Sequence, residues 1–235
     1  MSGDKNNIVM ISASPKAGTE SASAFLADLQ ARFFRDMGFS TLRLDVRKSL
    51  IRGNVENDYA LMLEADAIII TFPLYIYCLP GMLMRFLQDY LDFCRVKGRN
   101  NSGTRIYAVV NCGFPEAWIN NEAVGVISSF SRSIGAMFRF GLLIGGGGML
   151  VGTCDAPFMR KTMGRISGAF IKMGEDIKIK GSEKIDNILV EASIPHRLYH
   201  FMGNKGWVIS AKSNNLKKKD LYRKPYQPET SGESG

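Results

Sequence analysis

The sequence has few cysteines and histidines, and neither is spaced for a known metal motif. The cysteines are separated by 16, 18 and 42 residues, so there is no CxxC motif of a zinc site or a redox disulfide. His196 and His200 lie four residues apart without an HExxH motif, and we interpret them as solvated or partner-contacting side chains. We expect no metal, and we expect reduced thiols in a cytoplasmic protein. The four cysteines are Cys78, Cys94, Cys112 and Cys154.

The sequence also shows neither a secretory signal nor a membrane span. The start, MSGDKNNIVMISAS, has no charged region followed by a cleavable apolar segment. An uncharged run of 18 residues, Ala67–Met84, is interrupted by Pro73, Pro80 and Gly81, which a helix in lipid tolerates poorly. The run Phe140–Cys154 is shorter than the roughly 20 residues that a span needs. We expect an intracellular protein without a membrane span.

Nothing in the composition indicates disorder, collagen-like repeats or a coiled coil. The 235 residues are 46% hydrophobic, 22% charged and 10% aromatic, which is ordinary for a globular enzyme. This length and hydrophobic content suit one sizeable α/β domain better than two very small ones.

The positive charge is concentrated in the last third of the chain. Residues 1–154 carry a net charge of +2, and residues 155–235 carry +6 of the total of +8. We expect 1–154 to be the core, and 155–235 to be a basic, mostly helical extension of the same domain whose last ten or so residues are disordered. The Lys-rich stretch 204–219 has a single tryptophan and no groove-reading element, so we expect no nucleic-acid partner. The cations could attract an anionic cofactor, and association with a membrane surface stays open.

Four short apolar runs, and one run in which apolar and polar residues alternate (Thr41–Val46), predict β-strands. The run AIIITF at 67–72 is continuously apolar, as expected when both faces of a parallel sheet are covered. The predicted strands are Ile8–Ser12, Thr41–Val46, Ala67–Phe72, Arg105–Val110 and Gly141–Gly145.

Longer runs with helical spacing alternate with these strands. Strict alternation over about 150 residues predicts a doubly wound, parallel α/β sheet with helices on both faces. The predicted helical regions are Ser21–Met37, 56–65, Gly81–Lys97, Glu116–Phe138, 157–180 and 183–201.

In such a sheet the ligand lies at the carboxyl ends of the strands, so the loops after the first, third and fourth strands are the candidate site. The first loop, SASPKAGTESAS at 12–23, combines hydroxyls, a lysine and a helix start, which suits an anion such as a phosphate. It contains neither a GxGxxG dinucleotide turn nor a GxxxxGK[ST] P-loop. The alternative is that Ser21 or Thr19 only caps the helix.

The other two loops suit a planar ring. The stiff, aromatic loop 73–81, PLYIYCLPG, could border a heteroaromatic ring, or it could simply pack under a helix or a dimer partner. After the fourth strand, NCGFPE at 111–116 includes Gly113, which allows a close approach of the backbone to a ligand. Cys112 has no histidine near it in sequence, and we expect an inert thiol rather than a nucleophile.

Together, SASPKAGTESAS, EADAIIITFPLYIYCLPG and VVNCGFPE resemble the flavodoxin-like NAD(P)H-dependent FMN reductases and quinone reductases over about residues 5–150. The end segment Lys224-Pro225-Tyr226 is similar to that of an extended subgroup of this fold. The resemblance implies a three-layer sandwich with five strands in the order 2-1-3-4-5, bound FMN, and a homodimer.

The resemblance also implies which residues hold FMN. Glu20 would contribute through its backbone N–H, because its carboxylate would repel a phosphate. The sequence departs from the family at Ala13, where glycine is common, at Ile76, where larger or polar residues are frequent, and at Met84 and Gln88, where lysine and aspartate are usual. The implied cofactor-binding residues are Ser14, Lys16, Glu20, Ser21 and Ala22 in the first loop, Pro73, Leu74, Tyr75, Ile76 and Tyr77 in the second, and Asn111, Cys112, Gly113 and Phe114 in the third.

The resemblance implies an enzyme in which hydride passes from a nicotinamide to FMN and then to a quinone-like or other small acceptor. Because the flavin performs the redox step, we assign no catalytic acid, base or nucleophile. One alternative is an FMN-binding electron carrier or regulatory flavoprotein without NAD(P)H activity, and another is an interaction module of the same fold. Carriers of this fold tend to be strongly acidic, so the charge of +8 favours the reductase.

Overall fold

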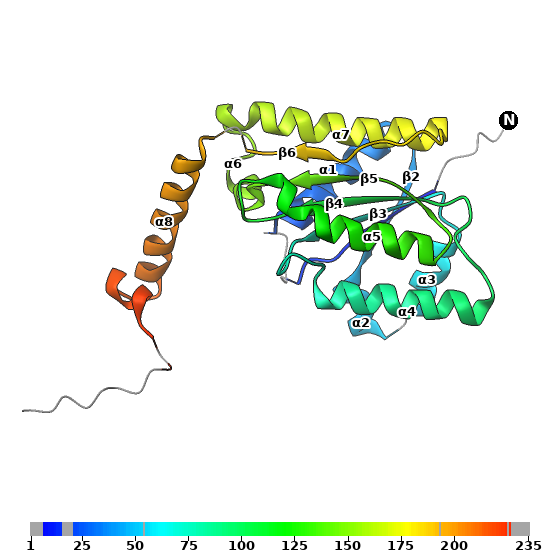
Figure 1. Ribbon diagram of the computed structural model, residues 1–235, viewed down its shortest axis with the longest axis horizontal. Helices are drawn as coiled ribbons and strands as arrows, with labels where there is room; N and C mark the ends of the chain where they lie inside the picture. The colour runs from blue at the N-terminus through cyan, green and yellow to red at the C-terminus, as the bar shows by residue number, and fades with distance from the viewer. Residues whose placement is uncertain (1–6, 16–20, 54, 193, 225, 227–235) are drawn as a thin grey trace, which may run out of the picture. The chain divides into compact units, whose positions relative to one another are not determined.

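A six-stranded, all-parallel sheet forms the centre of the larger of two units, Met1–Ser193, and the second unit is Ile194–Gly235 (Figure 1). This computed structural model describes residues 7–15, 21–53, 55–192, 194–224 and 226. The strand order is β2-β1-β3-β4-β5-β6. The strands are β1 (Asn7–Ser12), β2 (Ser40–Asp45), β3 (Ala67–Pro73), β4 (Arg105–Asn111), β5 (Met137–Ile144) and β6 (Ile188–Val190).

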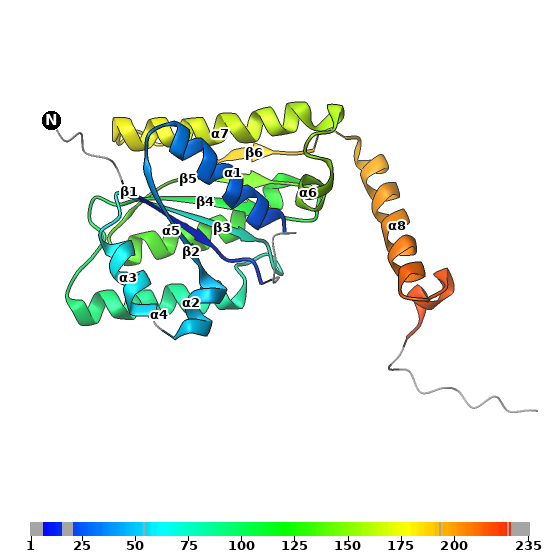
Figure 2. The same cartoon turned by 180° about the vertical axis from the view of Figure 1, so that it is seen from behind.

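Helices cover both faces of this sheet (Figures 1 and 2). The helices α1 and α7 pack on one face, and α3, α4 and α5 pack on the other. The longer elements are α1 (Ala22–Asp36), α2 (Val46–Arg52), α3 (Val55–Leu63), α4 (Gly81–Lys97), α5 (Asn121–Ser133) and α7 (Arg160–Ile179), and the short ones are η1 (Ala117–Asn120), η2 (Gly147–Met149), α6 (Leu150–Thr153) and η3 (Pro157–Met159).

The hydrophobic core consists of two clusters, one on each face of the sheet, and the central strand β3 contributes side chains to both. Ile68 and Ile70 enter the cluster with α3, α4 and α5, whereas Ile69 enters the cluster with α1 and α7, and all three are fully buried. Alternation of strand side chains between two covered faces explains the continuous apolar run in the sequence. Each buried isoleucine contributes about 1.5–3 kcal/mol relative to an exposed one.

The predicted α/β architecture and the order 2-1-3-4-5 are confirmed, with two corrections. The region 183–201 is not one helical region, because Ile188–Val190 adds a sixth strand beside β5. The region Glu116–Phe138 is also not one helix, because the chain turns at Gly135, whose φ is +74°, and enters β5 at Met137. A left-handed φ is cheap only for glycine, so helix α5 ends before this residue.

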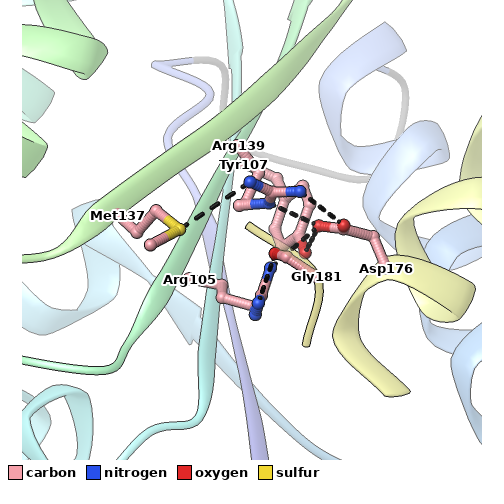
Figure 3. A network of polar contacts seen from close by, with 6 residues as sticks. All are labelled: Arg105, Tyr107, Met137, Arg139, Asp176 and Gly181. Atoms are coloured by element: carbon pink, nitrogen blue, oxygen red, sulfur yellow. Dashed lines mark hydrogen bonds and ion pairs between the residues drawn. The ribbon is translucent and has the colours of Figure 1, made fainter. Parts of the chain in front are cut away.

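A buried network of ion pairs and hydrogen bonds connects α7 to strands β4 and β5 (Figure 3). The Asp176 carboxylate in the last turn of α7 accepts hydrogen bonds from Arg139 Nη2 at 2.7 Å, Arg139 Nε at 2.8 Å and the Tyr107 hydroxyl at 2.6 Å. Arg105 Nη1 lies 3.3 Å from the same carboxylate, and Arg105 Nη2 donates to the Gly181 carbonyl. Burial alone would raise the pKa of Asp176, but the bonds from Arg139 and Tyr107 and the arginine charges outweigh it and lower this pKa.

The second unit is a basic helical segment. It contains α8 (His196–Ser213) and the short helix η4 (Lys218–Tyr222), joined where the Leu216 N–H donates to the Ala211 carbonyl at 2.8 Å. Ala211 is buried there, whereas Phe201 and Trp207 are exposed. Residues 194–235 carry eight basic and three acidic side chains, so +5 of the net charge of +8 belongs to this unit. Among the helices in the described part of the chain, none is long and apolar enough to cross a membrane.

Candidate functional site

A cavity of about 300 Å³ lies at the carboxyl ends of β1, β3 and β4. It is formed by the three loops that the sequence indicated, together with the glycine-rich segment after β5. Its described lining contains no charged side chain. The lining residues are Ser14, Ser21, Ala22, Ser23, Pro73, Leu74, Tyr75, Asn111, Cys112, Gly113, Gly147, Gly148 and Val151.

The loop after β1 brings hydroxyls to the start of α1. Ser14 and Ser21 line the cavity, as does Ala22. Ser21 caps α1, because its Oγ accepts the Ala24 N–H at 3.1 Å, so the capping role that the sequence suggested as an alternative exists in addition to the position in the cavity. The first turn of a helix leaves backbone N–H groups that the helix itself cannot pair. Two predicted residues of this loop, Lys16 and Glu20, lie outside the described residues.

The loop after β3 makes a tight turn at the mouth of the cavity. Tyr75 and Cys78 exchange two backbone hydrogen bonds of 2.9 Å, and the two residues between them, Ile76 and Tyr77, have φ values of +48° and +59°. A left-handed conformation costs a β-branched residue such as isoleucine about 1–3 kcal/mol. The turn leaves Ile76 95% exposed and Tyr77 58% exposed. Pro73, Leu74 and Tyr75 therefore line the cavity, whereas Ile76 and Tyr77 do not.

Asn111 ties the first and third loops together. It is buried, and its Nδ2 donates to Ser23 Oγ at 2.8 Å and to the Phe72 carbonyl at 3.3 Å. A hydrogen bond between the last residue of β4 and the first turn of α1 fixes the distance between the two sides of the cavity. Asn111 was predicted from the sequence as a cofactor-binding residue, whereas Ser23 was not, although it belongs to the hydroxyl-rich segment 12–23.

Cys112 lies in the cavity wall as a buried thiol. Its Sγ lies 3.4 Å from the Phe114 carbonyl, to which the thiol donates. Burial raises the pKa of the Cys112 thiol, which keeps it protonated and unreactive at neutral pH. Gly113 also lines the cavity, but Phe114 does not and is half exposed.

The glycine run after β5 supplies part of the cavity wall, which was not predicted from the sequence. The Gly146 N–H donates to the Phe114 carbonyl at 2.6 Å, and the Gly147 N–H donates to the Cys112 carbonyl at 2.8 Å. A Cβ on Gly147 would lie 2.8 Å from Asn111 Oδ1, so only glycine fits there without a shift of Asn111. The four consecutive glycines at 145–148 could have indicated this wall from the sequence, because such a run permits close contact between backbones.

Comparison with known proteins rests on structure alone. No protein-family model matches the sequence, and no curated protein matches it. A flavone reductase is similar with a TM-score of 0.55 and 9% identity, over 77% of this chain and 66% of that one. An apo NADH:FMN oxidoreductase, EMOB, has a TM-score of 0.53 and 16% identity, over 76% of this chain and 91% of that one. Rubredoxin oxygen:oxidoreductase from Desulfovibrio gigas has a TM-score of 0.51 and 12% identity, over 76% of this chain and 37% of that one.

These similarities and the strand order decide the fold. The chain has the flavodoxin-like fold. At these identities the similarity establishes the arrangement of the elements and not the residues of the site. The flavodoxin-like order places a switch point between β1 and β3, where consecutive connections leave for opposite faces of the sheet. The cavity of this flavodoxin-like protein lies at that point, between the loops after β1 and β3.

Proposed function

We propose that the protein is an FMN-dependent oxidoreductase that takes hydride from NAD(P)H and delivers electrons to a quinone-like or other small acceptor. The main support for this proposal is the cavity at the switch point, whose lining includes three serine residues from the segment 14–23 and Pro73, Leu74 and Tyr75 from the loop after β3. A phosphorylated ligand with a planar apolar ring matches such a lining. Two of the structural neighbours are a flavone reductase and an NADH:FMN oxidoreductase, which supports an oxidoreductase.

The residues present fit FMN. Ser14, Ser21 and the start of α1 offer hydroxyl and N–H donors for a phosphate, and no carboxylate in the described lining opposes it. Tyr75 and the backbone from Asn111 to Gly113 would border the ring. When bound, the flavin would supply hydride and electron transfer, so the protein's own groups have to bind, orient and shield it.

The carrier alternative is less well supported by the charge. Unit Met1–Ser193 carries 22 basic and 19 acidic side chains, so the part with the cavity lacks the acidic surplus of small carriers of this fold.

The four cysteines are free, which suits the reducing cytoplasm. We also propose a homodimer, whose mass light scattering after size-exclusion chromatography would report.

The phosphate end of the site is tested by comparing FMN with riboflavin, which lacks the phosphate. We expect FMN to bind more tightly, and we expect Ser14→Ala to weaken FMN binding by about 1–2 kcal/mol, since a hydroxyl donor to a charged group is lost. Riboflavin affinity should stay unchanged in this variant. Quenching of flavin fluorescence on titration with protein measures all four dissociation constants. Equal loss of affinity for both ligands would place the phosphate elsewhere.

A further inference from the structure

A second cavity, of about 800 Å³, adjoins the first one at the edge of the flavodoxin-like sheet. It lies beside the carboxyl ends of β1 and β2, between α1 and α2, and Ser14 lines both cavities. Its volume suits a nucleoside-sized ligand. Ser14 therefore marks the point where one extended ligand could pass from the flavin cavity into the second cavity.

Four cationic side chains belong to residues that line the second cavity, and two of them have no acidic partner within the described residues. Arg43 pairs with Asp28, and Arg52 lies 3.7 Å from Asp58 and donates to the Lys48 carbonyl. Arg47 and Lys48 also line the cavity, and within the described residues their side chains have no hydrogen bond or ion pair. Two adjacent unpaired cations in a concave surface attract an anion with more than one negative charge.

The acids of this cavity do not cancel the two cations. Asp28 is held by Arg43, and Asp45 is the N-cap of α2, where its Oδ1 accepts the Lys48 backbone N–H at 3.0 Å. Asp45 keeps its charge there, because a backbone N–H does not neutralise a carboxylate. The lining carries four cationic and two anionic side chains, so a net charge of +2 is left for a ligand.

The cavity also has an apolar wall. Leu44 is buried in it, and Ile51 is 72% exposed although it is a large apolar residue. A purine base bound in the cavity would shield the Ile51 side chain from water, whereas inorganic phosphate has no apolar surface with which to do so. The cavity thus combines a contact for a heteroaromatic base with a contact for a phosphomonoester.

We propose that this second cavity binds the adenosine 2′-phosphate end of NADPH, with Arg47 and Lys48 on the 2′-phosphate and Ile51 against the adenine. The role of NADPH as the hydride donor rests on the proposed function. The second cavity would make the protein prefer NADPH over NADH, because only NADPH carries the 2′-phosphomonoester that the two cations select. Arg47 and Lys48 are specificity residues that contact the cofactor far from the reacting atoms.

The test uses adenosine phosphates without a nicotinamide, so that binding is measured independently of hydride transfer. Calorimetry on the full chain should show that 2′,5′-ADP binds at least about tenfold more tightly than 5′-AMP, as two hydrogen bonds between charged groups provide. The variant Arg47→Ala/Lys48→Ala should bind both nucleotides equally. The control Arg160→Ala/Lys161→Ala removes an adjacent, exposed Arg-Lys pair that lines neither cavity and should leave the tenfold preference intact.

Failure of this inference is distinguishable from failure of the proposed function. If the protein binds FMN and NADH reduces it, but 2′,5′-ADP and 5′-AMP bind equally, the second cavity is not a 2′-phosphate site. The inference is also overturned if the Arg47→Ala/Lys48→Ala variant keeps the preference, or if inorganic phosphate competes as well as 2′,5′-ADP. If the nucleotide preference is present and FMN does not bind, the second cavity stands and the proposed function fails.

Discussion

Replacing Asp176 by asparagine should lower the free energy of unfolding by about 3–5 kcal/mol, the usual cost of removing one partner from a buried ionic network. The amide has nearly the shape of the carboxylate but no charge, so Arg105 and Arg139 would lose the acid that both contact. The side chains of Asp176 and Arg139 are only 7% and 4% exposed, which leaves little water to replace the lost partner. Urea unfolding followed by circular dichroism measures the difference.

The control for this variant is Glu175→Gln, which removes an exposed carboxylate from the neighbouring position of α7. It should change stability by less than about 0.5 kcal/mol, as most surface substitutions do. The network lies at the amino ends of β4 and β5, and the flavin cavity lies at the carboxyl ends. Folded Asp176→Asn protein should therefore bind FMN like the wild type, and a matched loss of FMN affinity would contradict this separation.

The effect of Asp176→Asn should also depend on pH. The pKa of Asp176 is lower in the folded state, so the folded protein takes up the proton less readily than the unfolded chain does. The stabilisation is complete above the unfolded pKa of about 3.9, and it is lost as the pH falls through the folded pKa. The gap between wild type and Asp176→Asn should therefore be full at pH 7 and narrow below about pH 4. A gap that widens in acid would contradict the assigned charge state.

Adding one methyl group at Gly145 should both destabilise the protein and weaken FMN binding. A Cβ at Gly145 would lie 2.1 Å from the Pro115 carbonyl oxygen and 3.0 Å from the Ala117 nitrogen. Both neighbours are backbone atoms, so the loop after β4 would have to move, at a cost of about 3 kcal/mol or more. This loop continues from Asn111–Gly113, which line the flavin cavity. Thermal unfolding and FMN titration of Gly145→Ala measure the two effects.

The matched control is Gly152→Ala, where an added Cβ has no heavy atom within 4 Å and the backbone is helical. This variant should be as stable as the wild type or slightly more so, because alanine is the better helix former. If Gly145→Ala behaved like Gly152→Ala, the contact between the glycine run and the loop after β4 would have no energetic role.

The parts of the fold that local patterns determine were predicted well. Helix α4 has the predicted bounds, Gly81–Lys97, because an amphipathic pattern begins after Pro80 and stops at Gly98 in a left-handed conformation. Strand β3 was predicted because every position of AIIITF is buried. Strand β6 was missed, since three residues are too few for a periodic signal. Helix α2 was missed because Val46 continued the alternating pattern of β2.

The parts of the site that depend on distant contacts were not predictable. Asp176 lies 37 residues from Arg139 and 69 from Tyr107, and no local pattern connects them. Gly145 and Gly147 meet backbone and side chains of the loop after β4, which only the folded sheet brings near. Ile76 and Tyr77 were predicted to border the ring, but a left-handed turn, unusual for isoleucine, takes both side chains away from the described lining of the cavity. The assignment of these two residues to FMN stays a prediction.

The central claim is tested most directly by mixing the FMN-loaded protein with NADPH, and separately with NADH, in an anaerobic stopped-flow spectrometer. If the protein is a reductase, the absorbance of the oxidised flavin is lost on mixing. If the second cavity binds the 2′-phosphate, NADPH reduces the flavin faster than NADH does at equal concentration. Dithionite is the control that shows the bound flavin to be reducible. Flavin that dithionite bleaches, but that neither nucleotide bleaches, would contradict the account and leave an electron carrier.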